Sequence, residues 1–283
     1  NNKRKLKGKM LILLTNKCNL SCKHCMQKGS PNNTLFMDEK VFETALCGAK
    51  QLGARVLNIA GGEPTILDTD ILRDYLVKAL SLDFMVVLET NGYFLDDEEK
   101  TKMLTDIALE YSNFLIQISA FKEYYTNREH VLDKFRQRKF AVRKLQEALK
   151  DRLFISDENN VKQLTALGRC EEGEMLEKAK KFDRYPSCIN SALIMAQSDL
   201  AKGLPCYALE DCGKFCVPMV DPNGDIHMGE SIFCKKICNI ADGKDKIIEA
   251  MANFKPCGRC PNYHWHFDEP SCDKDVVVKN LLN

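Results

Sequence analysis

The chain has 283 residues, of which 45% are hydrophobic, and its 41 lysine and arginine residues nearly balance its 40 aspartate and glutamate residues. This apolar fraction can form a substantial core, and the balanced charge gives no basic field that would indicate nucleic-acid binding. No apolar stretch approaches the roughly 20 residues that cross a membrane, and the first residues lack the apolar segment of a signal peptide. We therefore expect a soluble cytoplasmic protein without a nucleic-acid or membrane partner.

The chain contains 14 cysteines. In a short secreted chain this number would indicate disulfides, but this chain is long and shows no secretory signal, so metal binding is the expected use. Cys47 lies within a helical pattern and is expected to be a small buried hydrophobe. Most of the other cysteines lie in the last hundred residues, at Cys188, Cys206, Cys212, Cys216, Cys234, Cys238, Cys257, Cys260 and Cys272.

The first predicted strand is the apolar run at residues 10–14, and a loop with three cysteines follows it: Cys18, Cys22 and Cys25. Four cysteines close a structural zinc or iron–sulfur site, whereas three cysteines on a [4Fe–4S] cluster leave one iron open to a ligand that is not protein. The spacing therefore indicates a reactive cluster. A partial zinc site or a thiol-rich loop is the alternative that the residues leave open.

This CxxxCxxC spacing after a first strand resembles the signature of the radical S-adenosylmethionine (radical SAM) family. The resemblance implies a [4Fe–4S] cluster on these three cysteines, SAM at its open iron, and an external electron donor such as flavodoxin or ferredoxin. It also implies that SAM is cleaved to methionine and a 5′-deoxyadenosyl radical, which abstracts a hydrogen atom from the substrate. In the family the residue before the third cysteine lies near the adenine. His24 has this position, and a solvated loop histidine is the alternative.

Residues 38–52 are predicted to form a helix with Asp38 as its N-cap, and a buried strand at residues 55–59 leads into the motif Gly61, Gly62, Glu63 and Pro64. Two glycines allow the backbone to approach a ligand closely, and a carboxylate at a strand end can pair with an ammonium group. The resemblance implies that this motif contacts the amino group of SAM. A plain tight turn is the alternative.

Helices and strands then alternate, with a helix at residues 67–80, a strand at 84–88, a helix at 96–109 and a strand at 114–119. This alternation predicts an α/β fold with a parallel sheet and ligands at the strand ends. The resemblance implies a partial (β/α)6 TIM-like barrel, in which polar residues at the strand ends hold the ribose and carboxylate of SAM. Asn91 and Ser119 have such positions, although Phe121 replaces an aspartate that family members often carry.

The second half of the predicted barrel is compressed. Residues 127–150 are predicted to form one long basic amphipathic helix, followed by strands at residues 152–155 and 163–167. These two strands are too close for the usual crossover helix, so one barrel unit is abbreviated or the register differs. Residues 167–169 resemble the Gly-Arg-Ala segment that closes the barrel in family members with extra clusters, with Cys170 in place of the alanine.

The cysteine-rich tail contains a predicted hairpin at residues 216–228 with an Asn-Gly turn. It resembles the SPASM and twitch subfamilies, which place a cysteine before the hairpin and a second one five residues after the turn glycine. Cys212 suits the first position, but Gly229 stands at the second, where Cys234 is a substitute after a local shift. Another register takes Gly229 as the motif glycine, with Cys216 and Cys234 as ligands.

We therefore divide the chain into a radical SAM partial barrel at residues 1–185 and an auxiliary iron–sulfur domain at 186–283. One or two auxiliary [4Fe–4S] clusters are expected, and zinc is the alternative because thiolate pairs hold it equally well. His227, His264 and His266 are candidate ligands or histidines near the ligands. The candidate cysteine ligands of the tail are Cys212, Cys216, Cys234, Cys238, Cys257, Cys260 and Cys272.

The function expected from this resemblance is that of a radical SAM oxidoreductase. The preferred hypothesis is an enzyme that oxidises or cross-links a peptide or protein side chain with the help of an auxiliary cluster. A twitch-type dehydrogenase or cyclase acting on a small molecule is the second hypothesis, and a zinc-binding interaction protein without enzymatic activity is the third. No catalytic acid or base can be assigned from the sequence.

Overall fold

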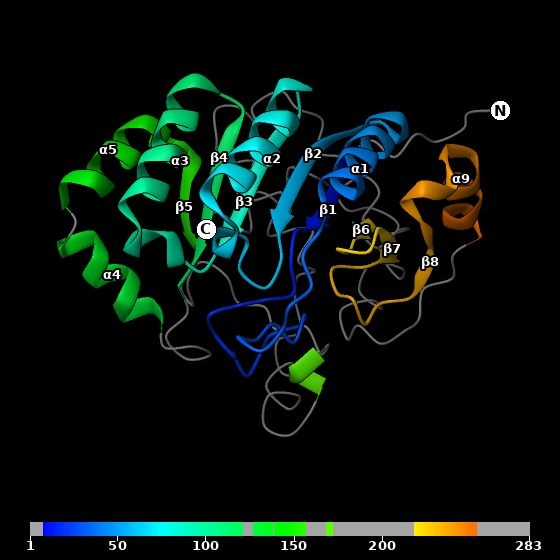
Figure 1. Ribbon diagram of the computed structural model, residues 1–283, viewed down its shortest axis with the longest axis horizontal. Coiled ribbons are helices and arrows are strands. Elements are labelled where there is room, and N and C mark those ends of the chain that lie inside the picture. Colours follow the sequence, from blue (N-terminus) through cyan, green and yellow to red (C-terminus); the bar gives the residue numbers. More distant parts are fainter. Residues whose placement is uncertain (1–7, 121–126, 138, 157–167, 172–217, 254–283) are drawn as a thin grey trace, which may run out of the picture.

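The computed structural model describes residues 8–120, 127–137, 139–156, 168–171 and 218–253. Within these ranges the strands form one sheet with the order β5-β4-β3-β2-β1-β6-β7-β8 (Figure 1). The first five strands run parallel to one another, which confirms the predicted α/β class. Their bounds are Gly8–Leu13 for β1, Ala54–Ala60 for β2, Met85–Thr90 for β3, Phe114–Ser119 for β4 and Leu153–Ser156 for β5.

Helices connect these strands at the positions that the hydrophobic spacing indicates. The first, α1, begins after Asp38, whose carboxylate accepts a 2.8 Å hydrogen bond from the N–H of Val41, and ends at Gly53 with a φ of 82°. The helices of the described ranges are α1 (Glu39–Leu52), α2 (Thr69–Ser81), α3 (Glu98–Glu110), α4 (Asn127–Gln137), α5 (Lys139–Leu149) and α9 (Lys244–Ala252). The short 3-10 helices are η1 (Pro64–Ile66), η2 (Tyr93–Asp96), η3 (Lys150–Arg152), η4 (Gly168–Glu171) and η5 (Ile240–Asp242).

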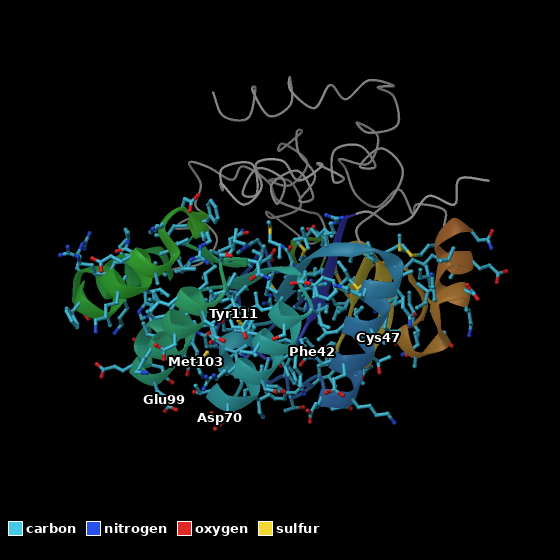
Figure 2. All side chains as sticks on the ribbon, turned by 90° about the horizontal axis from the view of Figure 1, so that it is seen from above. Phe42, Cys47, Asp70, Glu99, Met103 and Tyr111 are labelled. Carbon is cyan, nitrogen blue, oxygen red and sulfur yellow. The ribbon has the colours of Figure 1, made fainter. Side chains whose placement is uncertain are left out.

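One face of the sheet packs against these helices and contains the main core. Phe42 of α1 stacks on Tyr75 of α2 with ring centroids 4.2 Å apart, and the core extends through Phe84 and Phe114 beside the strands. Figure 2 shows the helices gathered on one side of the sheet, with Glu99 at the outer surface. This burial stabilises the layered arrangement of sheet and helices.

The opposite face of the sheet, here called the inner face, carries the alternate residues of the strands. It contains two small apolar clusters, formed by Leu11, Leu13, Ala60 and Met219 and by Val56, Met85, Val87 and Leu115. By the same alternation, polar residues also belong to this face: Lys9, Asn58, Glu89, Gln117 and Ser119. The strands therefore present a partly polar surface on the side away from the helices.

The predicted hairpin of the tail is present as β6 (Pro218–Val220) and β7 (Asp225–Met228), which pair antiparallel. Gly224 makes the turn with a φ of 83°. The next strand, β8 (Lys236–Asn239), pairs with β7, while β6 pairs parallel with β1 through Leu11 and Met219. The hairpin thus continues the main sheet at the free side of β1, whereas the predicted strand at residues 163–167 and the domain boundary at 185 lie outside the described residues.

The prediction of one long helix at residues 127–150 is wrong. The segment forms two helices, α4 and α5, whose axes point in different directions (Figure 1). The two helices contact different neighbours. His130 and Lys134 of α4 pair with Asp96 of η2 at 3.1 and 2.6 Å, whereas α5 packs along α3. Separate packing partners explain why the amphipathic pattern does not produce one straight helix.

Candidate active site

The loop that follows β1 lies over the ends of β2, β3 and β4 and forms one cavity with them. The cavity brings together residues that are widely separated in the sequence. It is lined by almost every site residue predicted in the first half of the chain, namely Cys18, Cys22, His24, Cys25, Gly61, Gly62, Glu63, Asn91 and Ser119. Pro64, the remaining one, begins the short helix η1 and is buried beside the cavity wall.

The three cysteines of the loop are free thiols, with Cys18 buried and Cys22 and Cys25 half-buried. Burial raises the pKa of Cys18 and that of Cys22 to about 12 although the positive charge of Arg169 lowers both, so neither is a thiolate without a stronger positive charge nearby. A metal centre supplies such a charge and deprotonates a coordinating thiol. The donor set therefore suits an iron–sulfur cluster.

In the part of the chain that the structure describes, no three His, Cys, Asp or Glu side chains are arranged to hold one metal ion. A cubane cluster takes one thiolate on each of three irons, so its ligands need not converge on a single point. The ligand roles of the three cysteines accordingly remain predictions from their spacing and their shared cavity.

The two glycines of the Gly-Gly-Glu-Pro motif allow the cysteine loop itself to approach the end of β2. A Cβ at Gly62 would lie 2.1 Å from the carbonyl oxygen of Lys17, and one at Gly61 would lie 2.6 Å from that of Thr15. The N–H of Gly62 donates to Thr15 at 2.7 Å, and the N–H of Glu63 donates to Lys17 at 2.8 Å. The two glycines were expected to let a ligand approach closely. In the structure it is the backbone of the cysteine loop that approaches them, and this contact fixes the distance between the loop and the end of β2.

Glu63 is fully buried and is held by hydrogen bonds from neighbouring strand ends. Its Oε1 accepts bonds from the hydroxyl groups of Thr65 and Thr90 at 2.6 and 2.7 Å, and its Oε2 accepts a bond from the N–H of Asn91 at 2.6 Å. Burial raises the pKa of Glu63, while these hydrogen bonds lower it. The carboxylate is therefore fixed in direction, and it faces a cavity where an ammonium group would find an acceptor.

Asn91 connects the end of β3 to the cysteine loop. Its side-chain amide donates to Asn19 at 2.8 Å and to the sulfur of Cys18 at 3.7 Å. Its Oδ1 accepts a bond from the N–H of Tyr93 at 3.1 Å, which fixes the amide orientation. In this structure Asn91 positions the cysteine loop, a role that the sequence pattern did not indicate.

Arg169 is a further residue of the site that sequence reasoning did not nominate. Its guanidinium donates to the carbonyls of Cys22 and Gly29 at 2.7 and 2.6 Å, and it lines the cavity. The preceding Gly168 has a φ of 64°, and a Cβ there would lie 2.5 Å from the carbonyl oxygen of Met26. The Gly-Arg pair therefore clamps the cysteine loop, and its resemblance to a family segment was the available signal.

The segment after β7 also contacts the cysteine loop. The hydroxyl of Ser231 donates to the carbonyl of Met26 at 2.7 Å, and the N–H of Ile232 donates to Oε1 of Gln27 at 3.1 Å. Gln27 in turn donates to the carbonyl of Glu230. The cysteine loop is thus held from both sides, by Arg169 and by the segment that follows the hairpin.

Gly229, which stands where the hairpin pattern expects a cysteine, makes room for another cysteine. It has a φ of 135°, and a Cβ at this position would lie 2.4 Å from the sulfur of Cys234. The sulfur of Cys234 therefore occupies the space that a side chain at residue 229 would need. The turn itself lies at Gly224, as the first register requires, and not at Gly229.

The other candidate cysteines have varied positions. Cys238 of β8 belongs to the main hydrophobic core, and burial raises its pKa to about 11. Cys47 is exposed on α1, so the expectation that it is buried is wrong. The remaining candidate ligands of the tail lie outside the described residues: Cys212, Cys216, Cys257, Cys260 and Cys272.

Comparison with protein families agrees with this geometry. The model of the Radical SAM superfamily matches residues 12–169, which is more than half of the chain. The chain therefore belongs to the radical SAM superfamily, whose members use a [4Fe–4S] cluster and SAM. The match spans the cysteine loop, the Gly-Gly-Glu-Pro motif and Arg169.

Relatives in sequence cover a limited part of the molecule. A GTP 3′,8-cyclase of Limosilactobacillus fermentum is 32% identical over 117 residues, covering 39% of this chain and 33% of that protein. An S-adenosylmethionine-dependent nucleotide dehydratase of a Thermoplasmatales archaeon is 29% identical over 92 residues, covering 32% of each chain. The chain thus matches about a third of the length of these curated relatives.

Solved structures resemble the chain over most of its length. BtrN in complex with AdoMet and 2-DOIA has a TM-score of 0.50 and 13% identity, covering 86% of this chain and 82% of its own. Streptococcus suis SuiB bound to the precursor peptide SuiA has a TM-score of 0.50 and 14% identity, covering 97% of this chain and 71% of its own. These similarities concern the fold. Among the described residues, no helix has the length and apolar character needed to cross a membrane.

Proposed function

We propose that this protein reductively cleaves SAM and uses the resulting 5′-deoxyadenosyl radical to abstract a hydrogen atom from a substrate. The observation that carries the proposal is the shared cavity, which is lined by the three cysteines of the loop together with Glu63, Asn91 and Ser119. These residues come from the ends of four neighbouring strands. Ligands of parallel α/β folds bind at such ends.

The residues of the cavity have distinct proposed roles. Cys18, Cys22 and Cys25 would hold a [4Fe–4S] cluster, which supplies the electron for SAM cleavage when bound. Glu63, fixed by Thr65, Thr90 and Asn91, would accept hydrogen bonds from the amino group of SAM. His24 and Ser119 line the same cavity and would contact the adenine and the ribose or carboxylate.

Other residues around the cavity hold the cysteine loop in place. Gly61 and Gly62 place the loop directly on the end of β2, and Arg169 fixes the loop from the other side. A radical must be aimed at one hydrogen atom, and residues held rigidly around the cavity help to achieve this. An external donor such as flavodoxin or ferredoxin would deliver the electron.

For the substrate, we propose a peptide or protein side chain that is oxidised or cross-linked with the help of one or two auxiliary [4Fe–4S] clusters in the tail. The hairpin β6–β7 and the sulfur of Cys234 beside Gly229 support this proposal, because they suit a SPASM- or twitch-like tail. A second candidate is a nucleotide, favoured by the names of the matched relatives, which include GTP 3′,8-cyclases and a nucleotide dehydratase.

The experiment is an anaerobic assay of the reconstituted and reduced protein with SAM. Formation of 5′-deoxyadenosine, absent in a Cys18→Ala, Cys22→Ala, Cys25→Ala variant, is the expected result. Deuterated peptides and deuterated nucleotides then test the substrate class, since deuterium enters 5′-deoxyadenosine only from the true substrate. A colourless protein that binds zinc and leaves SAM intact would refute the proposal.

A further inference from the structure

Four polar residues form a cluster on the inner face beside the proposed SAM cavity. Asn58 comes from β2, Glu89 from β3 and Lys9 from β1, while Glu230 follows β7. We call this group the inner polar cluster. Buried polar groups are costly unless they are satisfied, so such a cluster in the middle of a sheet calls for an explanation.

The hydrogen bonds of the cluster are incomplete. Asn58 is 1% exposed, and its amide nitrogen donates to Oε1 of Glu89. Its carbonyl oxygen Oδ1 is buried and accepts no hydrogen bond within the described part of the chain. This oxygen is therefore an acceptor that needs a donor.

The charges of the cluster are also unbalanced. Lys9 pairs with Glu230 at 3.2 Å, and their side chains are only 4% and 15% exposed. The charges of Lys9 and Glu230 both act on Glu89. The pKa of Glu89 is raised, mainly by burial; the positive charge of Lys9 lowers it and the negative charge of Glu230 raises it further. The described members thus supply two carboxylates and one ammonium group. The cluster is rich in acceptors and short of positive charge.

The position of Glu89 connects the cluster to the chemistry. Glu89 lines the cavity that also contains the three cysteines of the loop and Ser119. It directly precedes Thr90, which donates to Glu63. A group bound by Glu89 would lie in the same cavity as the groups that would hold SAM.

We propose that the inner polar cluster binds a cationic nitrogen group of the substrate, an amine or a guanidine. Such a group supplies the missing positive charge and donates hydrogen bonds to Glu89 and to Oδ1 of Asn58. This inference rests on the proposed function, because it takes the cavity to be the reaction site. A cationic peptide side chain and a small amine or guanidine share this chemistry.

The test measures binding to the full, reconstituted chain by calorimetry under anaerobic conditions with SAM present. The probes are agmatine, an acetylated arginine tripeptide and the same tripeptide with citrulline, which has the shape of arginine without its charge. Agmatine and the arginine tripeptide distinguish a small ligand from a peptide. The arginine tripeptide or agmatine should bind, and citrulline should bind about tenfold more weakly or worse, as expected for the loss of a charged hydrogen bond.

Glu89→Gln should abolish the preference for the charged probe, whereas Glu99→Gln removes an exposed carboxylate of α3 and should keep it (Figure 2). If Glu89→Gln does not fold by circular dichroism, Glu230→Gln, which removes the other negative charge of the cluster, should reduce the preference for the charged probe. Failure of both cationic probes to bind, equal binding of the neutral probe, or an unchanged preference in the folded variant would overturn the inference. SAM cleavage without any probe is measured separately, so failure of the proposed function is recognised independently.

Discussion

Glu63 and Asn91 join the ends of two neighbouring strands through a 2.6 Å hydrogen bond from the N–H of Asn91 to Oε2 of the carboxylate. Asn91 also donates to Asn19 in the cysteine loop. The proposed SAM acceptor and the loop of the proposed cluster are therefore positioned by one residue. A change at either site should affect SAM binding and cluster retention together.

Glu63→Gln should weaken SAM binding by about tenfold or more, because a charged hydrogen bond to the amino group is lost. In the variant, an amide N–H2 replaces one oxygen of the carboxylate and faces the donors of Thr65 and Thr90 or the donor of Asn91. At least one of these buried donors then loses its acceptor. Equilibrium dialysis with labelled SAM measures the affinity, and Glu99→Gln is the matched control. Unchanged affinity in the folded variant would show that Glu63 has only its structural role.

Cys22→Ala should abolish SAM cleavage and lower the iron content after reconstitution, because one of three thiolates is removed. Cys47→Ala removes an exposed thiol of α1 and should change neither quantity. Iron analysis and visible absorbance give the result. Iron from auxiliary clusters would remain in the Cys22→Ala variant. The result is therefore the difference in iron content between the Cys22→Ala and Cys47→Ala variants.

Gly62→Ala should lower the free energy of unfolding by about 1–3 kcal/mol and impair cluster retention, because the added Cβ would lie 2.1 Å from the carbonyl oxygen of Lys17. Gly243→Ala is the matched control. Its φ is 87°, but its Cβ would meet nothing within 4 Å. It should cost about 1–3 kcal/mol from backbone strain and retain the cluster. Equal iron loss in both variants would contradict this reading.

Arg169→Lys should loosen the cysteine loop, because an ammonium group cannot reproduce the fork that reaches both Cys22 and Gly29. Each lost charged hydrogen bond costs about 1.5–3 kcal/mol. We expect faster cluster loss in the presence of a chelator, followed by visible absorbance. Arg143→Lys, on the exposed face of α5, should behave like the unmodified protein.

His227 should make stability depend on pH. Burial lowers its pKa, but hydrogen bonding to Asp221 and to the carbonyl of Cys234 outweighs burial and raises the pKa above its ordinary value of 6.5. The stabilisation from protonated His227 is then complete below 6.5 and is lost as the pH rises through the raised value. The difference in unfolding free energy between the protein and His227→Gln should be larger at about pH 6 than at about pH 8. No change in that difference would contradict the assignment.

Much of the site could be predicted because its residues follow directly from local patterns. Cys18, Glu63 and Asn91 each stand at the end of a recognisable strand, and strand ends of a parallel sheet meet at one edge. The side chains that support them were not predictable in this way. Thr90 and Arg169 act through contacts between distant segments, which neither spacing nor hydrophobic periodicity encodes.

The tail shows the same limit. Its hairpin was predictable from alternation and from the Asn223-Gly224 turn, but its pairing with β1 was not, because short strands carry little information about their partners. From the sequence alone, Gly229 was interpreted as a position where the expected cysteine ligand is missing. The structure shows a steric reason for the glycine, since the sulfur of Cys234 fills the space beside it.

The pairing of β6 with β1 also affects how the protein is made. Residues near the start of the chain depend on partners more than 200 positions later, as in the contacts of Lys9 and Gln27 with Glu230. Contacts at such separation form late, because a long loop must close first. During synthesis, the cysteine loop therefore emerges from the ribosome well before its second wall exists. We expect stable cluster binding to require the segment from residue 218 onward, so that a protein shortened before this residue should lose iron more readily than the full chain.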